Sequence, residues 1–474
     1  MGQWQPIATI AADVQAGRVT ARSIVEQSLK TIAKRSDYNA VIATLEERAL
    51  SRADTIDALV GSGASAGRLA GVPFIAKDNF LVFGAETTAA SNILKGFAAP
   101  YQATAIERLE AEGAICVAKA NLDAFAHGSS TENSDFMTTK NPRDMTRVPG
   151  GSSGGSAAAV VLEMAPFALG TDTGGSIRLP ASYCGAVGYK PTYGLVSRSG
   201  VVAMASSTDV IGPLAASVAD CALVIDVMAG RDSLDGTSIE NDPLGYADVT
   251  PALTGKKVGV IKEYMAEGVT APILGIINQA INAMADAGAE IIELSLPSLP
   301  TALAVYYILC PAEVSSNLGR YDGQRFGYSF QEADTLETSY KQSRSRGFGK
   351  EAKRRIMIGT YVLSSGYYDA YYKKAQTVRT KLINEFNAAL QEADFLVGPT
   401  APDVAFKIGE NIDDPLKMYL TDILTVAANL VGVPSISIPA GAVDGLPVGL
   451  QIMAAQRADR ELLSFANGVE ELLA

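Results

Sequence analysis

The sequence contains very little histidine and cysteine. Its 474 residues include one histidine, His127, and four widely spaced cysteines, Cys116, Cys184, Cys221 and Cys310. There is no CxxC pair and His127 has no close His or Cys neighbour, so no metal site is expected in this chain. Unpaired, dispersed cysteines are typical of proteins kept in a reducing compartment, and we expect the cytoplasm.

Long apolar runs and an excess of positive charge are also absent. No apolar stretch reaches the roughly 18 residues that a membrane span needs, and the N-terminus lacks the basic start and apolar centre of a secretory signal. The net charge of −12 disfavours direct binding of nucleic acid, which depends on Lys and Arg at phosphates. We therefore expect no contact with a membrane, and any RNA should be held by a partner.

The 48% of hydrophobic residues allow a large core, and helix and strand patterns alternate along the chain. Residues 6–60 read as helical. Strands are predicted within 67–80, 114–121, 165–172, 256–264, 290–296, 393–400, 434–441 and 447–454. Helices are predicted at 103–112, 154–164, 271–289, 418–432 and the C-terminus, and 301–390 is helical and rich in tyrosine. The simplest interpretation is one α/β domain over 1–474 with a helical insertion.

Three short segments carry the candidate chemistry. Ser176 lies in "GTDTGGSIRLP" (170–180), directly after an apolar run, and "PGGSSGGSAAA" (149–159) and "AKDN" (76–79) precede it. Glycines permit positive φ and close backbone approach, so these loops could aim several N–H groups at one oxyanion. A phosphate loop would need GxxxxGK[ST], which is absent. A nucleophilic serine usually has a histidine base, and a chain with one histidine raises the question of what activates Ser176.

The ordered set "GVPFIAKDN", "GGSSGGSAAAV", "GTDTGGSIRLPA" and "GYKPTYG" resembles the amidase signature family. The resemblance implies an α/β fold with a large, mixed, twisted β-sheet flanked on both faces by helices, and a signature core at 61–240. It also implies a Ser–Ser–Lys triad in which Ser176 is the nucleophile, Ser152 the bridging serine and Lys77 the base. A cis peptide is expected just before Ser152. The expected oxyanion hole consists of the N–H groups of Thr173, Gly174, Gly175 and Ser176.

The chemistry of such a triad is consistent with elementary principles. A lysine is normally cationic, with a pKa near 10.4, but burial favours the neutral form, which accepts a proton. The hydroxyl of Ser152 can relay that proton because it both donates and accepts. We expect Asp172 and Arg178 to support the nucleophile loop and Ser153 to contribute hydrogen bonds.

Further stretches resemble one subfamily, the A subunits of bacterial glutamyl-tRNA(Gln) amidotransferases. They are "GSSTENSDF" (128–136), "SSNLGRYDGQRFGY" (315–328), 351–379 and, most specifically, 406–441. The resemblance implies hydrolysis of glutamine and transfer of ammonia to a B subunit, which binds tRNA and uses ATP and Mg²⁺, while a C subunit completes a heterotrimer. No cofactor is then expected in this chain, and the helical region 301–390 should cover the substrate pocket.

By the same resemblance, Arg355 would bind the glutamine α-carboxylate and Asp422 the α-amino group, with Tyr306 nearby. A zwitterionic amino acid needs one cation and one anion, and a guanidinium matches a carboxylate well. Alternatives stay open at this point. Arg355 in "KRR" could lie on a solvated face, and one tyrosine of the pair at 306–307 could be core, whereas Asp422 on an otherwise apolar helix is less easily explained by packing.

Three hypotheses about function remain: a glutaminase subunit, a free-standing amidase and a scaffold without activity. A free-standing amidase for other amides is the enzyme alternative, which "FKIGENIDDPLKMYLTD" (406–422) disfavours. An idle scaffold is disfavoured by the intact Lys77, Ser152 and Ser176. The chain also reads "DAFAHGSSTENS" where the family commonly has "DEFAMGSSTENS". Ala124 and His127 thus replace Glu and Met, and we interpret His127 as a packed or hydrogen-bonded substitute.

Overall fold

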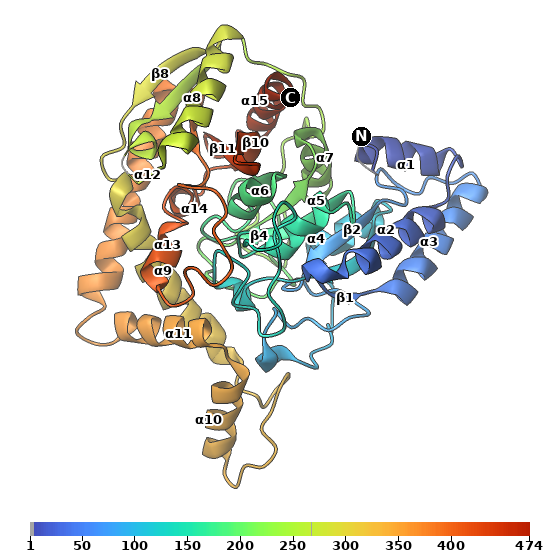
Figure 1. The fold of residues 1–474 in the computed structure, drawn as a ribbon. Coiled ribbons are helices and arrows are strands. Elements are labelled where there is room, and N and C mark those ends of the chain that lie inside the picture. The colour runs from blue at the N-terminus through green and yellow to red at the C-terminus, as the bar shows by residue number, and fades with distance from the viewer. Residues whose placement is uncertain (1–3, 267) are drawn as a thin grey trace.

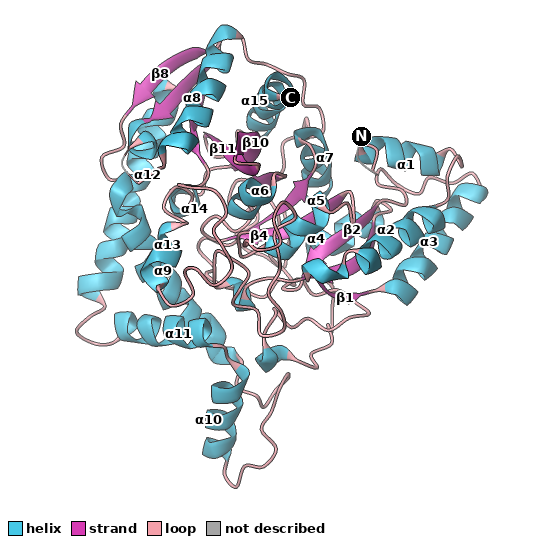
Figure 2. Ribbon diagram, in the orientation of Figure 1, coloured by secondary structure: helices cyan, strands magenta, loops and turns pink. Residues whose placement is uncertain are grey.

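One mixed β-sheet runs through the molecule, and helices cover both of its faces (Figures 1 and 2). The computed structural model describes residues 4–266 and 268–474. Its strands are β1 (Val41–Thr44), β2 (Pro73–Lys77), β3 (Ile115–Ala120), β4 (Phe167–Asp172), β5 (Val187–Lys190), β6 (Val210–Ala215), β7 (Lys257–Ile261), β8 (Glu290–Leu294), β9 (Phe395–Pro399), β10 (Ser435–Val443) and β11 (Leu446–Ala454). They lie in the order β1-β3-β2-β4-β6-β5-β10-β11-β9-β7-β8.

The helices differ widely in length. They are α1 (Ile7–Gln15), α2 (Ala21–Lys34), α3 (Glu46–Gly61), α4 (Thr104–Ala111), α5 (Gly154–Val161), α6 (Arg178–Cys184), α7 (Val218–Met228), α8 (Ala271–Asp286), α9 (Ala302–Asn317), α10 (Leu336–Gly347), α11 (Lys350–Leu363), the π-helical turn η7 (Asp369–Lys373), α12 (Lys374–Glu392), α13 (Pro415–Leu420), α14 (Val426–Val431) and α15 (Asp459–Leu473). Helix α10 and the loop before it project from the body of the molecule (Figure 1). No helix within the described residues is long and apolar enough to cross a membrane.

Alternating residues of the central strands separate two hydrophobic cores. In β2, Phe74 and Ala76 pack into a core with α4, α7 and α15, whereas Ile75 packs into another with α2, α3 and α5. This alternation is that of a strand buried on both faces. Helices α9, α12 and α14 enclose a third core beside the sheet. The predicted α/β fold, with a large mixed sheet between two layers of helices, is confirmed.

The strand order places two of the candidate segments at one edge of the sheet. Strands β2 and β4 are parallel neighbours, with Ala76 opposite Leu169. Lys77 is the last residue of β2 and Asp172 is the last residue of β4. Because parallel strands end at the same edge, the lysine and the glycine-rich loop that follows β4 meet there.

Three local predictions were wrong or incomplete. Residues 6–60 are not wholly helical, because β1 lies among the helices and pairs antiparallel with β3. Strands β5 and β6 were not predicted. Residues 418–432 do not form one helix, since α13 ends at Leu420 and α14 begins at Val426. The Thr425 hydroxyl donates to the carbonyl oxygens of Asp422 and Gly174, and such side-chain bonds to the backbone compete with a continuous helix.

Candidate active site

Lys77 lies at the centre of the site, fully buried at the end of β2. Its Nζ is 2.8 Å from Ser152 Oγ, 2.9 Å from Ser153 Oγ and 2.9 Å from Thr171 Oγ1. The structure therefore brings together two members of the expected triad, and it places Ser153 in the hydrogen-bonding role expected of it. Thr171 is a contact that the sequence did not suggest.

The loop before α5 carries both serines to the lysine. The peptide bond between Gly151 and Ser152 is cis, as the resemblance implied. The Ser153 N–H donates to the carbonyl oxygen of Ser176 at 3.1 Å, which ties this loop to the loop of the proposed nucleophile. Both Ser152 and Ser176 belong to the described residues, and no hydrogen bond joins their hydroxyls. Ser176 is 9% exposed, whereas Ser152 is fully buried.

A buried ion pair holds the nucleophile loop in shape. Asp172 and Arg178 are both fully buried, and Oδ1 of Asp172 lies 3.0 Å from Nη2 of Arg178. The same carboxylate accepts hydrogen bonds from the N–H groups of Gly175 and Ile177. Burial raises the pKa of Asp172, but Arg178 more than offsets this, so that the pKa lies below its usual range and the carboxylate stays ionised. These contacts match the supporting role expected of both residues.

The same network changes the expected oxyanion hole. The Gly175 N–H was one of four expected donors, but it already donates to Asp172 Oδ1 at 2.8 Å. Among the described residues, the N–H groups of Thr173, Gly174 and Ser176 donate to no other group of the protein. Three donors rather than four are thus free for an oxyanion, because the loop needs the fourth to hold its turn.

Side chains from other elements explain why this loop is rich in glycine. A Cβ on Gly174 would lie 2.6 Å from Cζ of Tyr306, and a Cβ on Gly175 would lie 2.2 Å from Oγ1 of Thr425. Gly175 also has a φ of +133°, which L side chains rarely adopt. Tyr306 therefore lies against the nucleophile loop itself, close to the free N–H groups.

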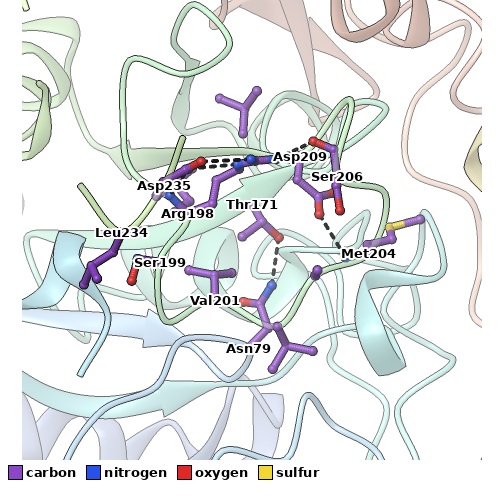
Figure 3. A pocket seen from close by; sticks show the side chains of 14 residues that line it. Asn79, Thr171, Arg198, Ser199, Val201, Met204, Ser206, Asp209, Leu234 and Asp235 are labelled. Atoms are coloured by element: carbon purple, nitrogen blue, oxygen red, sulfur yellow. Dashed lines mark hydrogen bonds and ion pairs between the residues drawn. The ribbon is translucent and has the colours of Figure 1, made fainter. Parts of the chain in front are cut away.

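A cavity of about 200 Å³ is lined by Asn79, Thr171 and Asp209, among others (Figure 3). Thr171 lines it, and its hydroxyl accepts from the Asn79 amide at 3.1 Å as well as from Lys77. Asp209 also lines the cavity and accepts from the Thr173 hydroxyl at 2.7 Å. Residues of the cavity wall thus hold both the lysine and Thr173, the first residue of the oxyanion loop.

Arg355 is buried on the inner face of α11 rather than solvated. Its Nε donates to Oε1 of Glu351 at 2.9 Å, and its guanidinium carbon lies 5.3 Å from the ring centre of Tyr307 and 5.6 Å from that of Tyr419. The Tyr419 hydroxyl donates to the same oxygen of Glu351 at 2.9 Å. Stacking and one ion pair hold the guanidinium in place at the wall of a pocket that Ser129 also lines.

Asp422 lies in the turn between α13 and α14, not on a helix as expected. The Tyr307 hydroxyl donates to its Oδ2 at 2.9 Å. Tyr307 therefore contacts both Arg355 and Asp422 and links the two expected substrate-binding charges. The sequence prediction named Tyr306 of this pair. The structure places both tyrosines beside site residues, with Tyr306 against Gly174 and Tyr307 against Asp422.

The two departures from the family pattern lie beside this pocket. Ala124 and His127 are both buried. Neither ring nitrogen of His127 has a hydrogen-bond partner in the described part of the chain. Burial, with a smaller repulsion from Arg355, lowers the pKa of His127 well below its usual range. His127 is thus a packed, neutral substitute, and the hydrogen-bonded alternative is not seen.

The family model described as Amidase matches residues 23–463. The chain belongs to the amidase family. The glutamyl-tRNA(Gln) amidotransferase A subunit of Caldanaerobacter subterraneus subsp. tengcongensis is 51% identical over 96% of this amidase and 93% of the relative. The crystal structure of a protein with the same description from Thermotoga maritima has a TM-score of 0.80 and 39% identity, covering 95% of this chain and 91% of that one.

Other solved structures share the fold of this amidase equally well. A peptide amidase from Stenotrophomonas maltophilia has a TM-score of 0.83 at 30% identity, covering 99% of this chain and 97% of that one. Backbone similarity therefore does not separate amidases that differ in substrate. Sequence identity and the groups in the substrate pocket must do so.

Lys77 and Asp422 are two buried groups of this site whose pKa values lie near neutrality. Burial lowers the pKa of Lys77 to about 7, against the opposing attraction of Asp123, Asp172 and Asp209. Burial raises the pKa of Asp422 to about 7, against the Tyr307 hydrogen bond and Arg355. Pairs of groups moved toward neutrality by a cleft are typical of catalytic sites. Near pH 7 the lysine is partly neutral and can act as a base.

Proposed function

We propose that this chain is the glutamine-hydrolysing A subunit of a glutamyl-tRNA(Gln) amidotransferase. The observation that carries this proposal is the identity of about one half, over nearly the whole chain, to proteins that bear that description. The site supports it, because an amidase centre lies beside a buried cation and a buried carboxylate. That pair fits a substrate with both charges, such as free glutamine.

The proposed hydrolysis begins with proton transfer. Neutral Lys77 takes the proton of Ser152, which takes the proton of Ser176, and Ser176 Oγ attacks the carboxamide carbon of glutamine. The N–H groups of Thr173, Gly174 and Ser176 hold the resulting oxyanion. The proton returns through Ser152 to the leaving nitrogen, ammonia departs and an ester forms on Ser176. The same base then takes a proton from a water molecule, which attacks the ester and releases glutamate.

The partners and cofactors follow from the same proposal. Ammonia passes to a B subunit, which holds the tRNA and uses ATP and Mg²⁺ to activate the mischarged glutamate, and a C subunit completes the heterotrimer. No cofactor takes part in the reaction of this chain, and the complex works in the cytoplasm. The acidic charge of the chain supports leaving the tRNA to the partner. The enzyme alternative is a free-standing amidase for neutral amides, which does not need a pair of opposite charges in its substrate pocket. We call the pair formed by Arg355 and Asp422 the clamp.

Substitution of the clamp separates the two enzyme readings. Asp422→Asn and Arg355→Met are expected to lower kcat/KM for glutamine by about 30- to 1,000-fold, because each removes one charged hydrogen-bond partner of the substrate, worth roughly 2–4 kcal/mol. For a compact neutral amide such as propionamide the loss should be less than about threefold. Initial rates with both substrates give the comparison.

Arg354→Met is the matched control, since Arg354 bonds to the same Glu351 but is half exposed. It should leave both substrates nearly unchanged. Equal losses for glutamine and propionamide in the clamp variants would make the two residues structural. A wild type that prefers propionamide outright would favour the free-standing amidase.

The pH profile should report both titrating groups. Lys77 and Asp422 each have a pKa of about 7 and must both be deprotonated, so kcat/KM for glutamine should fall below pH 7 with a slope greater than one. Hydrolysis of propionamide requires only that Lys77 be deprotonated. Its kcat/KM should therefore fall below pH 7 with a slope near one. A profile for glutamine that stayed flat from pH 5.5 to 8 would contradict these assignments.

A further inference from the structure

The side chain of His127 is fully buried, and neither of its ring nitrogens has a hydrogen-bond partner in the described part of the chain. Buried polar groups in folded proteins are nearly always paired, so an exception of this kind requires an explanation. Methionine, which the family commonly has at this position, fills a buried space without a strong polar group to satisfy. The histidine therefore costs stability in this fold unless its nitrogens bind something while the enzyme works.

The loop that carries the imidazole is held in place from several sides. The His127 N–H donates to the carbonyl oxygen of Ala124 at 3.0 Å, and its own carbonyl oxygen accepts from the Asn133 side-chain amide at 2.9 Å. The Asp123 carboxylate accepts from the N–H groups of Thr131 and Asn133 at 2.8 and 3.1 Å. The backbone that positions the imidazole is therefore fixed, as expected of a preorganised group in a binding site.

The imidazole lies close to Arg355. Gly128 and Ser129, the next two residues of the loop, line the same pocket as Arg355. The positive charge of Arg355 is near enough to lower the pKa of His127 further, in addition to the larger effect of burial. The Phe125 ring packs on the imidazole, with the two ring centres 6.2 Å apart. The imidazole is therefore neutral, and it offers one N–H donor and one acceptor nitrogen near the cation of the pocket.

The Arg355 guanidinium keeps donors free for a ligand. Its Nε donates to Glu351, and its Nη1 has only the sulfur of Cys310, a weak acceptor, at 3.8 Å. The described residues give Nη2 no hydrogen bond. An ionised carboxylate has about four acceptor positions, so a carboxylate held by these N–H groups can accept from a further donor. The N–H of His127 lacks any acceptor of its own, and a carboxylate beside it also offsets the repulsion from Arg355.

We propose that His127 donates a hydrogen bond to the α-carboxylate of the glutamine that Arg355 binds, and so favours glutamine over amides that lack a carboxylate. The proposal rests on the proposed function and adds a specificity residue at a position where methionine could not donate. His127 takes no part in proton transfer to the carboxamide. Because the α-carboxylate stays unchanged during hydrolysis, loss of the hydrogen bond should raise KM and leave kcat nearly unchanged.

The test compares three amides with the full-length chain. They are glutamine, glutaramate, which is glutamine without the α-amino group, and 4-aminobutanamide, which is glutamine without the α-carboxylate. His127→Met is expected to raise KM about tenfold or more for glutamine and for glutaramate, because each loses a hydrogen bond to a charged group. Its kcat should stay within twofold, and kcat/KM for 4-aminobutanamide should also stay within twofold. Initial rates of ammonia release give all of these values.

Two kinds of control variant separate hydrogen bonding from packing. His127→Asn and His127→Gln keep an N–H donor near the positions of Nδ1 and Nε2, and at least one of them should bring KM for glutamine within threefold of the wild type. Phe125→Leu removes the ring that packs on the imidazole but removes no hydrogen-bonding group. It should lower the melting temperature and leave the preference for glutamine over 4-aminobutanamide within threefold of the wild type.

The outcomes separate this inference from the proposed function. If the wild type prefers glutamine to 4-aminobutanamide and His127→Met keeps KM for glutamine within twofold, His127 only fills the core, and the proposed function stands. Equal losses for glutamine and 4-aminobutanamide would show a structural role and overturn the inference. A loss for 4-aminobutanamide but not for glutaramate would assign the imidazole to the α-amino group instead. A wild type without preference for glutamine would contradict both proposals.

Discussion

Replacing Ser176 by alanine is expected to lower kcat for glutamine hydrolysis by roughly 10⁴-fold or more, because it removes the atom that attacks the amide. Amidation of glutamyl-tRNA(Gln) with added ammonium chloride should continue at the wild-type rate in the assembled complex, since that reaction belongs to the B subunit. Glutamate release and tRNA amidation, measured on one preparation, give both rates.

Ser156→Ala provides the matched control. Ser156 is a buried serine of α5 whose hydroxyl donates to the carbonyl oxygen of Leu169 at 2.9 Å. Its loss costs about 1 kcal/mol of stability, and hydrolysis should stay within threefold. A folded, assembled Ser176→Ala complex that had lost the ammonia-driven reaction would argue against the division of labour. Hydrolysis within tenfold of wild type would require another nucleophile.

Replacing Lys77 by methionine should be nearly as severe, with a loss of roughly 10⁴-fold in kcat. Methionine has a similar volume but cannot accept the proton of Ser152. Lys77→Arg tests the role of the base separately from the charge, because a guanidinium stays protonated at any working pH. Both variants are therefore expected to be inactive toward glutamine and toward propionamide, whereas a lysine needed only for its charge would leave the arginine variant active.

The chain offers a second buried lysine as the control. Lys190 in β5 is also fully buried, and burial lowers its pKa to about 7, but its Nζ donates to the carbonyl oxygen of Pro191. Lys190→Met should keep most of the activity if contact with Ser152 is what matters. Equal inactivation by Lys77→Met and Lys190→Met would show that the loss reflects a missing buried charge near Asp172 and not a missing base.

Much of the site could be predicted from short segments, because the residues that take part in the proposed reaction lie within them. The resemblance of the ordered glycine-rich loops to the amidase signature family implied roles for Lys77, Ser152 and Ser176, and the structure places Lys77 against Ser152. The strand that ends at Lys77 and the strand before Ser176 were also predicted. Neither segment indicates that β2 and β4 are parallel neighbours, because pairing is a property of the assembled sheet.

Other features depend on contacts that no local pattern contains. Strand β1 is four residues long and lies at the edge of the sheet, where its pairing with β3 outweighs the helical character of its surroundings. The Gly175 N–H could not be removed from the oxyanion hole without knowing where the Asp172 carboxylate points. Tyr307 and Glu351 were missed because their importance comes from Asp422 and Arg355, which lie in other elements.

The buried Arg178 has a consequence for the synthesis of the protein. Besides Asp172, its guanidinium bonds to Asn429 and to Gln451, which lies 273 positions later in the chain. At a translation rate of about 5–20 residues per second, a ribosome needs roughly 15–55 s to cover that distance. Until the end of this interval the Arg178 guanidinium lacks at least one of the two amides that bond to it. The contacts that hold the nucleophile loop are therefore complete only after the last strand of the sheet, β11, has been made.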